Sequence, residues 1–317
     1  MPPATTVATG ARLHFGPLAW KPESGPDFGG WGVMIDRPRC VVRITRETGT
    51  APANASPSGR AVQLLARWLR ERPQSDRLAV EVLESLPDHR GLGSGTQLAL
   101  AIGAAAGLSL DARMPRLSDL ARVLERGARS AVGVYGFEQG GLIVDAGKRP
   151  GESLGRLAAR RPVPRTWRFV LAWPAGTQGL AGDAEASAFR TLPPFPQALT
   201  DRLSRLLLCD VLPAVDHGDF DGFAGGLGEY GERVGRAFES LQGGVVHAAS
   251  LPVWNAVRRR GVAGVAQTSW GPTLAIVQPD AAAAETLCAD LRDEFRDSVE
   301  LLVSQPLNQG AAIVGTE

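Results

Sequence analysis

The sequence has little cysteine and almost no lysine. Its three cysteines, Cys40, Cys209 and Cys288, lie far apart and form no CxxC pair. This spacing excludes a disulfide framework and favours buried free thiols in a reducing compartment. The only lysines are Lys21 and Lys148, so arginine supplies nearly all of the positive charge. Arginine is a planar, permanently charged donor that suits phosphates and carboxylates.

An excess of one charge and a long apolar run are also missing. The net charge is +1, which leaves no broad basic surface for nucleic acid and no acidic tail. The longest mostly apolar stretch, 98–108, is too short to span a bilayer. The first residues lack the basic and apolar regions of a signal peptide. We therefore expect no nucleic-acid partner, no membrane partner and a cytoplasmic location.

The remaining composition is that of an ordinary globular protein. Hydrophobic residues make up 44% and charged residues 21% of the 317 positions, enough for a sizeable core, and the length suggests two domains or one large one. Segment 149–165 is rich in Arg, Gly and Pro and separates two apolar blocks, so we predict domains at 1–155 and 156–317. A second long loop is expected over 174–197, where its length is typical of a mobile segment or a lid.

Strand and helix patterns are mixed without strict βαβ alternation, which predicts an α+β fold. Period-two or continuously apolar patterns predict strands at Ala11–Phe15, Gly32–Ile35, Cys40–Thr45, Leu78–Leu83, Gly141–Asp145, Trp167–Ala172, Gly264–Gln267 and Thr273–Val277. Helical spacing predicts helices at Gly59–Glu71, Thr96–Ala106, Leu117–Arg126, Leu199–Val211, part of Asp219–Leu241, Leu251–Arg260 and Ala281–Phe295.

The most informative segment is a glycine loop between the predicted strand 78–83 and a helix of small residues. Gly91, Gly93 and Gly95 alternate, which allows left-handed backbone angles and close approach of a ligand. The next helix offers unpaired N–H groups and the positive end of its dipole, so the segment is suited to a phosphate. Ser94 and Thr96 add hydroxyl donors. A glycine turn that packs a helix tightly on a sheet fits the same composition.

Two familiar phosphate motifs are excluded. The loop lacks the Gly-Lys-Ser/Thr ending of a Walker A sequence. Segment 226–231 matches GxGxxG, but it follows the acidic stretch 219–221 rather than a strand, so we interpret it as a chance match.

Several ordered segments carry a family resemblance. Pro87 followed by Gly91-Leu92-Gly93-Ser94-Gly95 resembles the phosphate-binding motif of the GHMP superfamily of small-molecule kinases. The sequence GLGSGTQL, preceded by a histidine, resembles the β-ribofuranosylaminobenzene 5′-phosphate (β-RFAP) synthase branch more closely. Further matching segments are 11–16, 126–133, 137–145 and 269–273.

The resemblance implies a GHMP-kinase-like two-domain fold, with an N-terminal domain like ribosomal protein S5 and a ferredoxin-like C-terminal domain. It also implies a decarboxylating phosphoribosyltransferase of methanopterin-type cofactor biosynthesis. Its substrates would be 5-phosphoribosyl diphosphate and 4-aminobenzoate or 4-hydroxybenzoate. Mg²⁺ would be required, no organic cofactor would be tightly bound, and the protein would be a homodimer.

Site roles follow from the resemblance and from residue chemistry. Catalytic roles are expected for Arg129, His14 and His89, and Glu138 and Asp145 are candidate magnesium ligands. Substrate-binding roles are expected for Arg12, Gly91, Gly93, Ser94, Gly95, Thr96, Gln97, Ser130, Tyr135, Ser269 and Trp270. Structural roles compete for some of these residues, since a strand histidine can be a satisfied core residue, Asp145 can cap a turn and Trp270 can be core.

Two departures from family patterns matter. GHMP kinases place a catalytic aspartate shortly after a Ser-Gly-x-Gly turn, where this chain has Val134 or Tyr135. The missing acid argues against phosphoryl transfer to an alcohol. Ala131 replaces the glycine of the synthase turn and would be strained there if the position requires a positive φ. An ATP-dependent GHMP kinase and a catalytically silent binding protein remain the alternatives.

Overall fold

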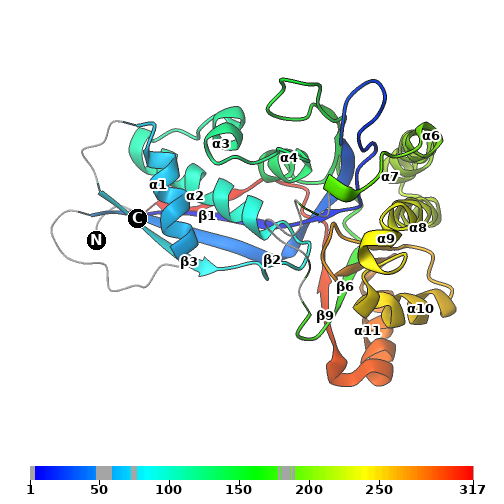
Figure 1. The fold of residues 1–317 in the computed structure, drawn as a ribbon. Helices are drawn as coiled ribbons and strands as arrows, with labels where there is room; N and C mark the ends of the chain where they lie inside the picture. Colours follow the sequence, from blue (N-terminus) through cyan, green and yellow to red (C-terminus); the bar gives the residue numbers. More distant parts are fainter. Residues whose placement is uncertain are drawn as a thin grey trace.

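The computed structural model describes residues 4–47, 59–72, 77–177, 179, 187 and 190–316. Two antiparallel sheets organise the chain (Figure 1). The first sheet is six-stranded, with the order β10-β1-β2-β4-β5, and β3 pairs with β2. Its strands are β1 (Ala4–His14), β2 (Gly30–Glu47), β3 (Arg77–Glu84), β4 (Leu142–Asp145), β5 (Leu157–Arg161) and β10 (Ala312–Thr316).

Strand β2 replaces the two strands predicted at 32–35 and 40–45. Its first half pairs with the end of β1 and with β4, and its second half pairs with the start of β1 and with β3. The register shifts between Gly10 and Ala11 of β1, where β2 contains the extra residues 36–38. Such a bulge bends and twists the strands without ending the ladder. The bend directs the end of β1, residues 12–14, toward the second half of the molecule.

One face of the first sheet is covered by helices α1 (Gly59–Leu69), α2 (Ser94–Asp111), α3 (Leu117–Val123) and α4 (Val132–Gln139) (Figure 1). Helix α2 packs directly on β1 and β2. Its alanines at 99, 101 and 104–106 are fully buried, because small side chains let the helix backbone approach the sheet closely. This packing fixes the start of α2 beside the end of β1.

The second sheet has the order β7-β8-β6-β9 and is packed against the later helices (Figure 1). Its strands are β6 (Arg168–Pro174), β7 (Val265–Gln267), β8 (Leu274–Gln278) and β9 (Val299–Ser304). The helices of this half are α6 (Gln197–Arg205), continued by the π-helical turn η1 (Leu206–Val211), α7 (Leu212–His217), α8 (Phe220–Ala237), α9 (Glu239–Gln242), α10 (Leu251–Arg259) and α11 (Ala281–Phe295). The mixture of helices and antiparallel sheets confirms the predicted α+β class.

The structure adds elements that sequence patterns did not predict. Strands β5, β9 and β10 and helix α4 were missed, and β5 lies within the segment 149–165 that was expected to be a linker. Strands β5 and β10 both belong to the first sheet, so the chain returns to its first half at the end. The boundary between 155 and 156 stays a prediction. The loop expected over 174–197 lies partly outside the described residues.

Within the described ranges, none of the helices is both long and apolar enough to cross a bilayer.

Candidate active site

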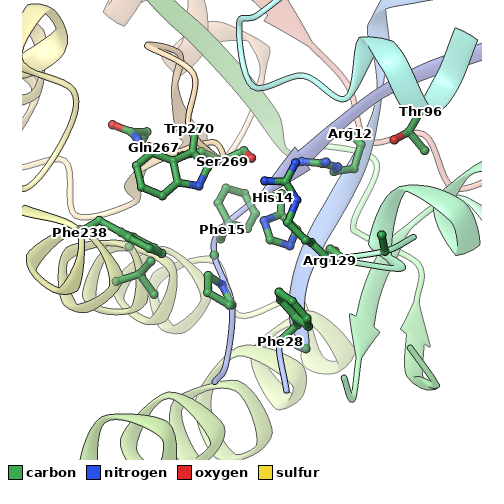
Figure 2. A pocket seen from close by; sticks show the side chains of 18 of the residues that line it. Arg12, His14, Phe15, Phe28, Thr96, Arg129, Phe238, Gln267, Ser269 and Trp270 are labelled. Atoms are coloured by element: carbon green, nitrogen blue, oxygen red, sulfur yellow. Dashed lines mark hydrogen bonds between the residues drawn. The ribbon is translucent and has the colours of Figure 1, made fainter. Parts of the chain in front are cut away.

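A cavity of about 200 Å³ lies between the two halves of the molecule. Its walls come from the end of β1, the segment 125–130, the α8 region and the turn 267–270. The cavity brings together several predicted site residues, namely Arg12, His14, Thr96, Arg129, Ser130, Ser269 and Trp270 (Figure 2). These residues lie far apart in the sequence, so their convergence supports a shared function.

The glycine loop has the backbone that an anion site requires. Gly91 and Gly93 have φ angles of 79° and 77°, in the left-handed region that favours glycine. Helix α2 begins at Ser94, and the amides of Thr96 and Gln97 donate to the Gly93 carbonyl oxygen. Among the described residues, none accepts a hydrogen bond from the amides of Ser94 and Gly95. The loop is partly exposed, so these amides remain available for an anion.

The glycine loop is attached to both halves of the molecule. The amide of Arg12 donates to the Leu92 carbonyl oxygen at 3.0 Å, which fixes the loop on β1. Thr268 Oγ1 donates to the Gly91 carbonyl oxygen at 2.8 Å. A side chain at Gly91 would overlap the backbone oxygen of Thr268, so the close approach of these two segments requires glycine. The loop is therefore positioned by contacts that only the folded two-lobed molecule provides.

His14 is an uncharged polar residue at the centre of the cavity wall. Its side chain is 8% exposed, and Nε2 has no hydrogen-bond partner among the described residues. Burial, followed by the positive charges of Arg12 and Arg129, holds the pKa of His14 well below its usual value of 6.5. The imidazole is therefore neutral near pH 7 and can donate or accept a hydrogen bond, depending on its tautomer.

The cavity wall combines cationic and aromatic side chains. Arg12, His14 and Arg129 point toward one another (Figure 2), and Arg126 also lines the cavity. The aromatic residues are Phe15, Phe28, Phe238 and Trp270, and the rings of the last two are 4.8 Å apart. This combination suits a ligand that carries negative charge next to an apolar ring.

The other predicted binding residues do not line the cavity. Gln97 is fully buried, where it accepts from Thr9 Oγ1 at 2.8 Å and donates to the Gly133 carbonyl oxygen at 2.9 Å. The hydroxyl of Tyr135 donates to the Gly155 carbonyl oxygen at 2.9 Å. His89, predicted to be catalytic, is exposed with a φ of 57° and does not line the cavity, so its role stays a prediction. Gly91, Gly93, Ser94 and Gly95 form the loop that leads to Thr96.

Glu138 and Asp145, the predicted magnesium ligands, also lie outside the cavity wall. Asp145 is 1% exposed and accepts from the amides of Ala131 at 2.6 Å and Gly147 at 2.9 Å. Glu138 is exposed on α4 and accepts from Gln139 Nε2. The described residues contain no group of three or more His, Cys, Asp or Glu that could hold a metal ion. Neither residue lines the cavity, and their metal role stays a prediction.

At the place of the missing kinase aspartate, the described residues provide no acidic substitute on the cavity wall. Val134 is buried, and among the described residues that line the cavity the only carboxylate is Glu125. The Glu125 side chain is 72% exposed and forms an ion pair with Arg67 at 2.5 Å. Ala131 has a φ of −88°, so the strain considered for alanine at this position is absent. The backbone there is right-handed and accommodates any L residue.

Sequence patterns missed part of the cavity. Arg126 lies within one of the segments that carry the family resemblance, and its proximity to Arg129 was the available signal. Phe15 also lies in such a segment, 11–16. Phe28, Phe238 and Gln267 had no such signal, because only the packing of distant segments brings them to the cavity.

Comparisons with known proteins find similar sequences over much of the chain. Residues 59–141, which contain the glycine loop, match the family described as GHMP kinases N terminal domain. The β-ribofuranosylphenol 5′-phosphate synthase of Methanothermobacter thermautotrophicus is 27% identical over 84% of this chain and 87% of its own length. The enzyme of the same name from Archaeoglobus fulgidus is 28% identical over 97% of this chain and 98% of its own length.

Solved structures share the fold at low sequence identity. Mevalonate diphosphate decarboxylase from Staphylococcus aureus superposes with a TM-score of 0.70 at 13% identity, covering 99% of each chain. Homoserine kinase from Cytophaga hutchinsonii superposes with a TM-score of 0.65 at 16% identity, covering 98% of this chain and 97% of its own. The chain thus has the fold of these solved structures, contains a region similar to the GHMP kinases N terminal domain and is similar over most of its length to the β-ribofuranosylphenol 5′-phosphate synthases.

Proposed function

We propose that the protein joins 5-phosphoribosyl diphosphate to 4-hydroxybenzoate or 4-aminobenzoate and releases carbon dioxide and diphosphate. The observation that carries the proposal is the cavity itself, which is lined by arginines, by Thr96 at the start of α2 and by several aromatic rings. Because the curated relatives are named for a ribofuranosylphenol phosphate, 4-hydroxybenzoate is the first acceptor to test. The methanopterin-type pathway follows from the same resemblance.

The proposed reaction needs no protein nucleophile. The bond between ribose C1 and the diphosphate oxygen breaks, and its electron pair leaves with diphosphate. The ring carbon that bears the carboxylate forms the new carbon–carbon bond to C1. The bond to the carboxylate then breaks, its electrons restore the aromatic ring, and carbon dioxide leaves. No proton is gained or lost overall, so a cavity wall without an alcohol-activating carboxylate is compatible with this route.

The roles of individual residues remain part of the proposal. The loop from Gly91 to Thr96 would bind diphosphate through its free amides and hydroxyls. Arg12 and Arg129 would bind phosphate or the carboxylate of the acid, and His14 would contribute a neutral hydrogen-bonding group next to them. Ser269 and Trp270 would close the aromatic side of the cavity.

Magnesium, a homodimer and a cytoplasmic location complete the proposal. Mg²⁺ commonly binds through substrate phosphates with few protein ligands, and when bound it would neutralise the charge of the leaving diphosphate. One structural neighbour is described as a complex with MVAPP, AMPPCP and magnesium. A bound metal that arrives with the substrate needs no cluster of acidic side chains.

Turnover assays distinguish the candidate functions. The protein is incubated with magnesium, 5-phosphoribosyl diphosphate and either acid labelled in its carboxyl group. We expect labelled carbon dioxide and diphosphate in equal amounts. ADP formation from ATP with an alcohol acceptor, in the absence of this release, would instead identify a GHMP small-molecule kinase. Binding of the phosphorylated substrate without any turnover would identify a catalytically silent binding protein.

A further inference from the structure

Arg126 lies between the cavity and the first turn of α2. It lines the cavity, and a Cβ placed on Gly95 would be 3.6 Å from Arg126 Nη1. The same Cβ would overlap Nη2 of Arg60, so both guanidinium groups lie against the helix start. Gly95 is one of the residues whose amide has no acceptor in the described part of the chain. Two cationic groups and two free amides therefore converge on one point.

The charges around this point are not balanced. Arg60 forms an ion pair with Asp88 at 3.2 Å, and Arg67 forms one with Glu125 at 2.5 Å. Arg126 has no ion pair with any residue that the structure describes, and its Nε is buried without a hydrogen-bond partner. Burial, then Arg60 and Arg67, lower the pKa of Arg126, and the nearby Glu125 offsets part of this effect. The fold thus holds a partly buried cation without an ion-pair partner among the described residues, and its burial is unfavourable.

A second buried polar atom in the same cavity also lacks a partner. The His14 side chain is 8% exposed, and its Nε2 is buried with no hydrogen-bond partner among the described residues. Buried polar groups normally have partners, so an unsatisfied one needs an explanation, and a bound ion is one such explanation. Because His14 and Arg126 both line this cavity, we infer a ligand there that is polar and carries negative charge.

We propose that Arg126 is an anion-binding residue that, together with the first turn of α2, binds the diphosphate group of the phosphorylated substrate. This inference rests on the proposed function for the identity of the substrate. Arg60 has a supporting role, because its exposed ion pair with Asp88 is weak and can be exchanged for a phosphate oxygen. A bound diphosphate would supply the negative charge that Arg126 lacks, with a planar guanidinium suited to two phosphate oxygens.

The decisive variant is Arg126→Met, which keeps the aliphatic stem and removes the charge. Arg122→Met is the matched control, since Arg122 pairs with Glu71 on the exposed surface. Titration calorimetry with inorganic diphosphate and magnesium measures affinity, and thermal unfolding measures stability. We expect Arg126→Met to weaken diphosphate binding at least tenfold and to leave the melting temperature unchanged or raised. Arg122→Met should change the affinity less than twofold.

Two further measurements separate this inference from the proposed function. Arg126→Lys should recover part of the diphosphate affinity, and the affinity for 4-hydroxybenzoate should stay within twofold in Arg126→Met. Diphosphate binding within twofold of the unaltered protein in Arg126→Met would overturn the assignment, even if the transferase reaction occurs. So would a loss of acid binding instead of diphosphate binding. Failure of the transferase assay with Arg126-dependent diphosphate binding would refute the proposed function alone.

Discussion

The hydroxyl of Thr268 donates a hydrogen bond to the carbonyl oxygen of Gly91 at 2.8 Å, across 177 positions of the chain. The same oxygen, Thr268 Oγ1, accepts from the amide of His14 at 2.9 Å. One buried hydroxyl therefore connects the turn 267–270, the glycine loop and the end of β1. These are three of the segments that determine where a phosphorylated ligand and the cavity wall lie relative to each other.

Replacing this hydroxyl should cost both stability and ligand binding. Thr268→Val keeps the shape of the side chain but leaves the Gly91 oxygen and the His14 amide without their partner. Each such loss in a buried setting costs about 1–3 kcal/mol. Chemical denaturation should show this decrease in the free energy of unfolding, and diphosphate affinity should fall as the loop loses its support.

Thr273→Val is the control for this prediction. Thr273 is also fully buried, but its Oγ1 has no partner among the described residues. Its replacement should leave stability unchanged or increase it, because no hydrogen bond is lost. Equal destabilisation by the two valine variants would contradict the role assigned to Thr268.

The sequence predicted those parts of the fold and site that depend on local pattern. The glycine loop, a helix that begins at Thr96, two residues after its observed start at Ser94, and the period-two strands can be read from neighbouring residues. Strand β10 could not be predicted, because its strand character depends on pairing with β1, such as Ala8 with Ala312. Strand β5 contains the polar sequence LAARR and resembles a linker until its partner β4 is known.

Side-chain roles were harder to predict than backbone elements. Gln97 follows the loop directly, yet its amide faces the core because helix α2 turns it toward Thr9 and Gly133. Phe28 and Phe238 reach the cavity from opposite halves of the chain. Such convergence depends on how the two sheets pack, which a one-dimensional pattern does not contain.

His14 should make stability depend on pH in the acidic range. Its pKa is lowered in the folded state, so below about pH 6.5 the unfolded chain binds a proton that the folded protein does not. The contribution of His14 is therefore present above about pH 6.5 and is lost as the pH falls toward the lowered pKa. The free energy of unfolding should decrease by up to about 1.4 kcal/mol per pH unit from this group.

His14→Gln provides the comparison for this pH dependence. Denaturation curves between about pH 5 and pH 8 should show a steeper acidic decrease for the unaltered protein than for the variant. His247, whose pKa is also lowered by burial, contributes equally to both proteins. Parallel curves would show that His14 does not remain neutral in the folded state.

Asp145 should be more important for the backbone around Ala131 than its position outside the cavity suggests. Asp145→Ala leaves the buried amides of Ala131 and Gly147 without an acceptor, at a cost of about 1–3 kcal/mol each. The neighbouring Arg129 and Ser130 should shift, and turnover should fall.

Glu152→Ala is the control, because Glu152 also accepts a hydrogen bond from a backbone amide but at an exposed site, where water can replace the carboxylate. A variant of Asp145 that folds normally but needs more magnesium would instead support its role as a metal ligand.

Gly91 is the position where an added methyl group should be most harmful to the site. Gly91→Ala meets two obstacles, since the residue has a φ of 79° and its Cβ would overlap the Thr268 backbone oxygen. The left-handed conformation alone costs alanine about 1–2 kcal/mol.

Gly25 is the control that measures the conformational cost by itself, because it has a φ of 87° and no other atom lies within 4 Å of the added Cβ. Gly25→Ala should therefore lower the free energy of unfolding by about 1–2 kcal/mol and leave diphosphate binding intact. Gly91→Ala should lower it further and weaken diphosphate binding, because the loop and the turn 267–270 must separate. If the two alanine variants behave alike in both measurements, the contact between Gly91 and Thr268 does not position the glycine loop.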